Sequence, residues 1–153
     1  MDTLISILHV AGAVFIVGPM AILPMTAMRA VRAGNGAQVA VLAKSTTIFA
    51  WLSLLVFVFG FGAMSMAPDE YELSITTPWI LWSIILYVIA FALTLFVVVP
   101  SMKKAAEALT AGTGTGAGDS GEAPKASYPA IAAGSGISSL LLLAVVVLMV
   151  WKP

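Results

Sequence analysis

The sequence contains no cysteine and very little charge, and both deficits narrow what the chain can be. Without cysteine it cannot form disulfides, thiolate metal sites, cysteine-ligated iron–sulfur clusters or a cysteine nucleophile. Only 9% of its 153 residues are charged, whereas 61% are hydrophobic. Soluble domains carry about 25% charged residues, so this chain has too little charge to cover a water-facing surface. Lipid is the solvent that suits most of it.

Histidine and net charge are scarce as well. Seven basic and seven acidic residues give a formal net charge of zero, which argues against a nucleic-acid partner because such proteins carry a basic patch. One histidine leaves no second imidazole for a catalytic triad, and the carboxylates all fall outside the apolar runs. The sequence also lacks a phosphate-binding motif. We therefore expect the chain by itself not to be an enzyme and to hold no cofactor.

The sequence does contain four long apolar runs. A helix needs about 20 mainly apolar residues to cross about 30 Å of hydrocarbon, and each run is long enough. The runs are continuous rather than alternating, which favours helices over the strands of a barrel. The expected spans cover residues 3–28, 46–67, 78–99 and 130–151.

The basic residues lie mostly on one side of these spans. Acidic residues occupy the second connection, at Asp69, Glu70 and Glu72, where no base is found. Six of the seven bases lie in the first and third connections, namely Arg29, Arg32, Lys44, Lys103, Lys104 and Lys125. Short loops rich in Lys and Arg stay in the cytoplasm. The sequence thus predicts an all-α membrane protein with four transmembrane helices in two hairpins and both termini outside, in the plasma membrane.

We expect residues 1–153 to form a single four-helix membrane domain. Gly34-Asn35-Gly36 is a turn signal between the first two spans. Thr77 before Pro78 predicts the start of the third helix, and Pro100 predicts its end, with a short surface helix to follow. The Gly-rich stretch at 112–127 predicts a flexible cytoplasmic linker. The two halves share no evident motif.

Three residues near the outer side are candidates for metal chemistry. His9 is the only ionisable side chain inside a span, and such residues suggest function. Met64 and Met66 end the second span, and thioethers select Cu(I). A copper site, a haem with His9 as one axial ligand, and a neutral imidazole bonded to a neighbouring helix all remain open.

Small residues predict where helices approach closely. They occur at 11–13 in the first span, at Gly60 and Gly62 in the second, and at 133–136 in the fourth, where Ser138 and Ser139 can bond across helices. Pro19 and Pro24 predict a kink in the first span, whose freed carbonyls neighbouring helices must satisfy.

The first span also carries a resemblance. Residues 8–18, LHVAGAVFIVG, resemble the first helix of a family of small four-helix predicted integral membrane proteins of unknown function. The same pattern is similar to helices of copper-resistance D-type membrane proteins, although their further His and Met positions are missing here. The chain looks actinobacterial in style, which implies an accessory subunit of the respiratory supercomplex of cytochrome bcc and cytochrome aa3 oxidase.

Two functions follow as expectations. In the first, the chain is a non-catalytic subunit whose partners are membrane lipids and other integral membrane subunits, with cytochrome oxidase and bcc subunits as the specific expectation. In the second, it is a small homo-oligomeric transporter or copper-handling protein.

Overall fold

The computed structural model describes residues 2–67, 73–112 and 122–152, and all regular structure in these ranges is helical. The elements are α1 (Asp2–Gly12), the π-helical turn η1 (Ala13–Val17), α2 (Gly18–Arg32), α3 (Gly36–Ser65), α4 (Pro78–Leu93), the π-helical turn η3 (Thr94–Val98), α5 (Val99–Gly112) and α6 (Glu122–Trp151). Each π turn joins its two neighbouring helices into one long rod.

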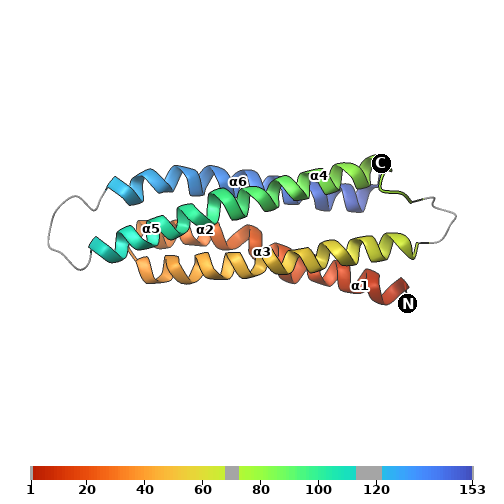
Figure 1. Ribbon diagram of the computed structural model, residues 1–153, viewed down its shortest axis with the longest axis horizontal. Helices are drawn as coiled ribbons and strands as arrows, with labels where there is room; N and C mark the ends of the chain where they lie inside the picture. Colours follow the sequence, from red (N-terminus) through yellow and green to blue (C-terminus); the bar gives the residue numbers. More distant parts are fainter. Residues whose placement is uncertain (1, 68–72, 113–121, 153) are drawn as a thin grey trace.

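The rods form an elongated bundle with both chain termini at the same end (Figure 1). We call this the terminal end, and the opposite end, where residues 33–35 reverse the chain, the turn end. Four helices in the described ranges are long and apolar enough to cross a membrane. An even number of crossings returns the chain to the side on which it started. The predicted all-α architecture with four spans is therefore confirmed.

The helices are longer than the predicted spans. The first continues to Arg32, and α3 begins at Gly36 after a tight turn in which Gly34 has a φ of 69° and the Asn35 side chain accepts a hydrogen bond from the Gln38 N–H at 3.0 Å. At 30 residues, α3 is about 45 Å long, whereas the hydrocarbon core is about 30 Å thick. The bundle therefore continues past the membrane.

The linker predicted at 112–127 is also shorter than expected. Helix α6 begins at Glu122, and residues 113–121 lie outside the described residues. Pro124 does not prevent this early start, because it falls in the first helical turn, where a backbone N–H has no helical partner to lose.

The prediction that Pro100 ends the third helix is wrong. The chain stays helical through Pro100 because a π turn precedes it, in which the N–H of Val99 bonds to the carbonyl of Thr94, five residues back. The first rod repeats the device, since the N–H of Gly18 bonds to the carbonyl of Ala13 just before Pro19. Proline has no N–H and its ring crowds the carbonyl four residues earlier, and a widened turn gives the ring the room that it needs.

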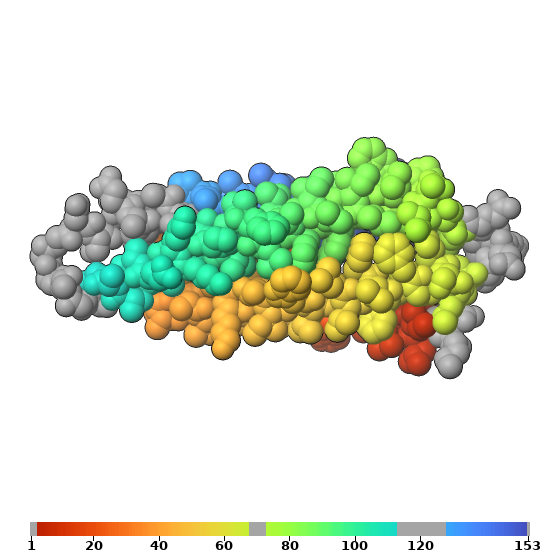
Figure 2. Space-filling model, in the orientation of Figure 1, coloured from red at the N-terminus to blue at the C-terminus, as the bar shows by residue number. Residues whose placement is uncertain are grey.

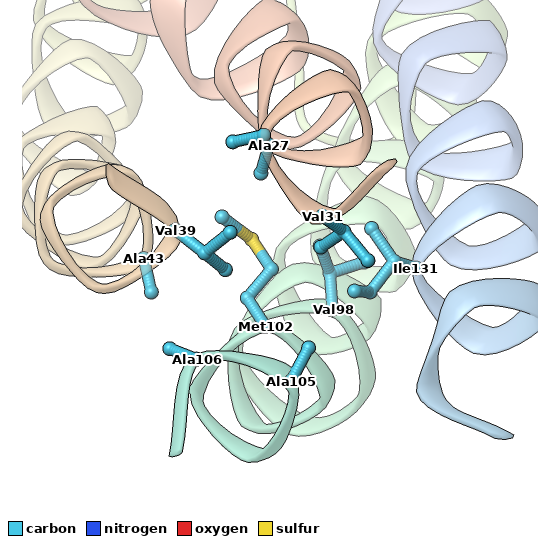
Figure 3. Close-up of a cluster of buried hydrophobic side chains, with 10 residues drawn as sticks. Ala27, Val31, Val39, Ala43, Val98, Met102, Ala105, Ala106 and Ile131 are labelled. Carbon is cyan, nitrogen blue, oxygen red and sulfur yellow. The ribbon is translucent and has the colours of Figure 1, made fainter. Parts of the chain in front are cut away.

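The most completely buried core lies at the turn end, where α2, α3, α5 and α6 surround it (Figure 3). Met102 projects from α5 toward α2 and α3, and it is fully buried. Most of the other members are small, which lets the backbones come close: Ala27, Ala30, Val31, Val39, Ala43, Val98, Ala105, Ala106 and Ile131.

Toward the terminal end the helices separate into two pairs, α1 with α3 and α4 with α6. Between the pairs, aromatic rings span the distance from α3 to α4. Phe57 stacks on Tyr87 with ring centroids 4.8 Å apart, and Trp51 meets Phe91 edge-on at 6.0 Å. Side chains of α3 and of the α4–α5 rod accordingly meet along this face of the molecule (Figure 2).

Two glycines in α6 provide a test of this packing. A Cβ on Gly134 would lie 2.8 Å from Cγ2 of Val98, whereas a Cβ on Gly136 would meet nothing within 4 Å. Overpacking of this kind costs about 1–3 kcal/mol. We expect Gly134→Ala to lower the midpoint of thermal unfolding in mild detergent and Gly136→Ala to leave it unchanged or raise it. Equal midpoints for the two variants would contradict the packing of α6 against η3.

Candidate functional site

His9 points from α1 into the contact with α3. Its Nδ1 lies 2.8 Å from the backbone carbonyl oxygen of Val56. A carbonyl oxygen only accepts hydrogen bonds, so Nδ1 carries the hydrogen and donates it. The bond joins two helices that are 47 positions apart in sequence at this point, and it fixes both the orientation and the tautomer of the neutral ring.

Gly60 provides the space for this ring. A Cβ at position 60 would stand 2.9 Å from Cε1 of His9. The same face continues on either side, because a Cβ on Gly12 would lie 2.8 Å from Cγ2 of Val56, and one on Gly62 would lie 3.3 Å from Cγ2 of Ile5. The predicted close approach at these glycines is confirmed, and Gly60 has the added role of seating the imidazole.

The second ring nitrogen of His9, Nε2, would lie 3.6 Å from a Cβ on Gly60. His9 is partly buried, and no protein group bonds to its Nε2 among the hydrogen bonds of the described residues. In the same part of the chain, no buried side-chain nitrogen or oxygen lacks a partner, so Nε2 is open to the surroundings. Histidines that ligate metals commonly donate their other ring N–H to a backbone carbonyl. His9 has that arrangement.

The two candidate methionines differ in position. Met64 lies four and eight residues after Gly60 and Val56, so all three share one face of α3, and its side chain is partly buried. Met66 follows the last residue of α3 and is 39% exposed. By helix register Met64 lies one turn after Gly60 on α3. In the described ranges, no three His, Asp or Glu side chains gather where they could hold a metal ion.

Hydroxyl groups meet in the middle of the bundle, and among them the sequence predicted an interhelical role only for Ser138. Ser53 Oγ lies 2.7 Å from the Tyr87 hydroxyl. The Thr94 hydroxyl donates to the carbonyl of Ala90 at 2.8 Å, and Ser138 Oγ lies 3.4 Å from both of these oxygens. These groups bond to one another and to backbone carbonyls, so they tie helices together.

Ser139 bonds across helices as expected. Its hydroxyl donates to the carbonyl of Ala21 in α2 at 3.1 Å, three residues before the helix-internal Pro24. The turn ahead of a proline is where helical bonds are lost. The carbonyl that Pro24 leaves without its helical donor is that of Met20, four residues back, so the Ser139 bond lies beside the kink and ties α6 to α2.

Cation–aromatic pairs close the bundle at its two ends. The Arg32 guanidinium donates to the Tyr128 hydroxyl and lies 5.2 Å from the ring centroid, which joins α2 to α6 at the turn end. At the terminal end the ammonium of Lys152 lies 6.0 Å from the ring of Trp79. Amphipathic rings and long basic side chains favour the headgroup region, and these pairs lie at opposite ends of the bundle.

The packing of the His9 ring against Gly60 can be tested by adding a side chain at position 60. Because His9 is the only histidine, its ring nitrogens give single signals in ¹⁵N NMR of the histidine-labelled protein. Under conditions that keep the ring neutral, we expect a protonated-type Nδ1 and an unprotonated-type Nε2. Gly60→Ala displaces the ring, so it should mix the two tautomers and lower the unfolding midpoint. A ring spectrum identical in the two proteins would show that His9 does not pack against Gly60.

Comparison with known proteins identifies the family. Residues 3–153 match the model of a family described as predicted integral membrane protein (DUF2269). No curated protein and no solved structure is significantly similar to the chain. The match covers nearly the whole sequence and agrees with the four apolar helices of the structure. The chain thus belongs to the DUF2269 family of integral membrane proteins.

Proposed function

We propose that the chain is a non-catalytic subunit that packs laterally, within the membrane, against other integral membrane subunits. Within the spans predicted at 3–28, 46–67, 78–99 and 130–151, the ionisable side chains are His9 and Tyr87, and the buried hydroxyls bond within the bundle. A transport pathway needs polar groups that face a cavity, and an enzyme needs groups that converge on a substrate. A subunit that acts through its surface needs neither.

The observation that carries this proposal is the π turn η1. The N–H of Gly18 bonds to Ala13 rather than to Val14, and Pro19 has no N–H to offer to Phe15. The carbonyls of Val14 and Phe15 thus lose their usual helical donors. The side chains of the same two residues are 62% and 74% exposed. Hydrocarbon cannot satisfy a carbonyl, whereas a neighbouring helix can.

A partner helix fits this surface well. Val10, Val14 and Phe15 form an exposed apolar face on α1 and η1, which suits the van der Waals packing that drives helix association in lipid. A Ser, Thr or Asn hydrogen on the partner helix would reach the released carbonyls. We define this surface, Val10, Val14 and Phe15, as the α1 docking face.

For the partner we propose the subunits of an actinobacterial cytochrome bcc–aa3 supercomplex in the plasma membrane. The small size of the chain and the sequence resemblance of its first span support this choice. A homo-oligomeric copper-handling protein is the second candidate, and the open Nε2 of His9 is the observation that favours it.

A gentle purification tests the first candidate. We expect the tagged chain, extracted in mild detergent, to bring down oxidase and bcc subunits identified by mass spectrometry, with haem absorption bands in the eluate. Phe15→Ala should reduce the yield of these partners because it truncates the α1 docking face. Leu143→Ala, a change at a 59% exposed position on α6, is the matched control. A colourless preparation without partners would reject the proposal.

The orientation with both termini outside is tested separately, using the absence of cysteine. Ala37 and the half-exposed Ile75 lie at the turn end and the terminal end. We expect Ile75→Cys to react with a membrane-impermeant maleimide on intact cells, and Ala37→Cys to react only after permeabilisation. The cysteine-free parent provides the blank, and the opposite labelling pattern would invert the topology.

A further inference from the structure

We propose that the chain carries a second docking face at the π turn η3 and that it bridges two copies of the same partner helix, one on each side of the bundle. This inference rests on the proposed docking function and extends it, because it says how many partner helices the chain holds and where they bind. The second face consists of exposed apolar side chains on α4 and η3, namely Val88, Ile89 and Phe96. We call it the α4 docking face.

The first and third rods contain the same local motif, which hydropathy and composition did not reveal. Residues 13–19 read AVFIVGP and residues 94–100 read TLFVVVP. Each segment forms a π turn that is followed by one residue and then by proline. In both, phenylalanine stands four residues before the proline, and the residue just before the proline donates its N–H five residues back. The two halves of the chain thus use one device twice.

The exposed side chains around the two turns correspond as well. Aligning Pro100 with Pro19 pairs Phe96, which is 79% exposed, with Phe15, which is 74% exposed. The same alignment pairs exposed residues of α4 with exposed residues of α1: Val88 with Ile7, and Ile89 with Leu8. Both rods run from the terminal end to the turn end (Figure 1), so the correspondence holds in direction as well as in sequence.

The two rods stand diagonally across the bundle. Helices α3 and α6 each pack against both α2 and α5, and Figure 3 shows α2 and α5 on opposite sides of the core. Halves that repeat in parallel are related by an axis along the membrane normal, which here is the long axis of the bundle. The exposed side chains of the two rods therefore point to opposite sides of the molecule, and each side needs a partner helix of its own.

The η3 turn leaves two carbonyls without a helical donor. The N–H of Val99 bonds to the carbonyl of Thr94 rather than to that of Leu95. Pro100 has no N–H to offer to the carbonyl of Phe96. The η1 turn leaves its own pair of carbonyls in the same way, so both docking faces present the same acceptors beside the same exposed aromatic ring.

The hydroxyl groups next to η3 are used within the chain. Thr94 donates to the carbonyl of Ala90 at 2.8 Å, and Ser101 donates to the carbonyl of Val97 at 2.7 Å. Lipid tails offer no hydrogen-bond donor, whereas a Ser or Thr on a neighbouring transmembrane helix does. The occupant of the α4 docking face is therefore an apolar helix with a hydroxyl donor, which is also the helix that suits the α1 docking face.

Photocrosslinking of the full tagged chain in intact cells tests this inference. The photoreactive residue p-benzoylphenylalanine replaces Phe15, Phe96 or, as a control, Leu143, which is 59% exposed on α6. We expect the first two positions to cross-link the same segment of the same partner polypeptide, mapped by mass spectrometry, and position 143 to give no such adduct. The reagent is an enlarged phenylalanine at exposed positions, so the fold is retained.

The outcomes separate this inference from the proposed function. An adduct at only one of positions 15 and 96, or different partners at the two, would overturn the bridging role and leave a single docking face. Adducts with another copy of this chain at both positions, no protein adduct at either, or the same adduct at position 143 would overturn the proposed function as well.

A second measurement counts the partners. In mild detergent, the ratio of partner to tagged chain, measured by quantitative mass spectrometry, should fall to about half in Phe96→Ala and in Phe15→Ala, because each removes one of two equivalent sites. The double variant should lose the partner, and Leu143→Ala should keep the parental ratio. A Phe96→Ala variant with an unchanged size-exclusion profile and the parental ratio would overturn the second face.

Discussion

A backbone in hydrocarbon must satisfy its own N–H and C=O groups, and this requirement shapes the whole chain. It explains why the apolar runs form helices, and why local adjustments of the backbone accompany Pro19 and Pro100. The π turns η1 and η3 widen the helix just before Pro19 and Pro100. Beside Pro24 another helix adds a hydrogen bond, where Ser139 donates to the carbonyl of Ala21. Pro19, Pro24 and Pro100 therefore lie within continuous rods and do not end them.

The same requirement limits what polar side chains can do. Each buried hydroxyl in the described spans bonds to a carbonyl or to another hydroxyl, as Thr94 does with Ala90 and Ser53 with Tyr87. His9 follows this rule with one nitrogen and departs from it with the other. That asymmetry singles out one imidazole nitrogen, in an otherwise closed network, as a position where the chain can meet something outside itself.

Hydropathy and charge were sufficient to predict the helical class, the number of spans and the tight turn at Gly34. They failed where local chemistry and tertiary packing compete. Pro100 is a helix breaker by its own chemistry, but the turn from Thr94 to Val98 absorbs it.

The candidate site was only partly predictable for a related reason. Composition alone made His9 conspicuous, and the softness of sulfur pointed to the methionines. The bond to Val56 joins a side chain to a backbone atom 47 residues away, and no sequence pattern encodes such a pairing. The one available signal was Gly60, whose four-residue spacing from Val56 and Met64 marks a single helix face.

The uneven packing of the bundle has a mechanical consequence. At the turn end, four helices surround side chains such as Met102 and Ile131, which are fully buried, whereas toward the termini the helices contact one another mainly as two pairs, α1 with α3 and α4 with α6. Stiffness should therefore decrease along the molecule from the turn end to the termini. When the bilayer thins or thickens, the two helix pairs can tilt relative to each other, while the tightly packed turn end keeps its arrangement. The hydrogen bond between His9 and Val56 lies within the α1–α3 pair, so such a tilt would leave it intact.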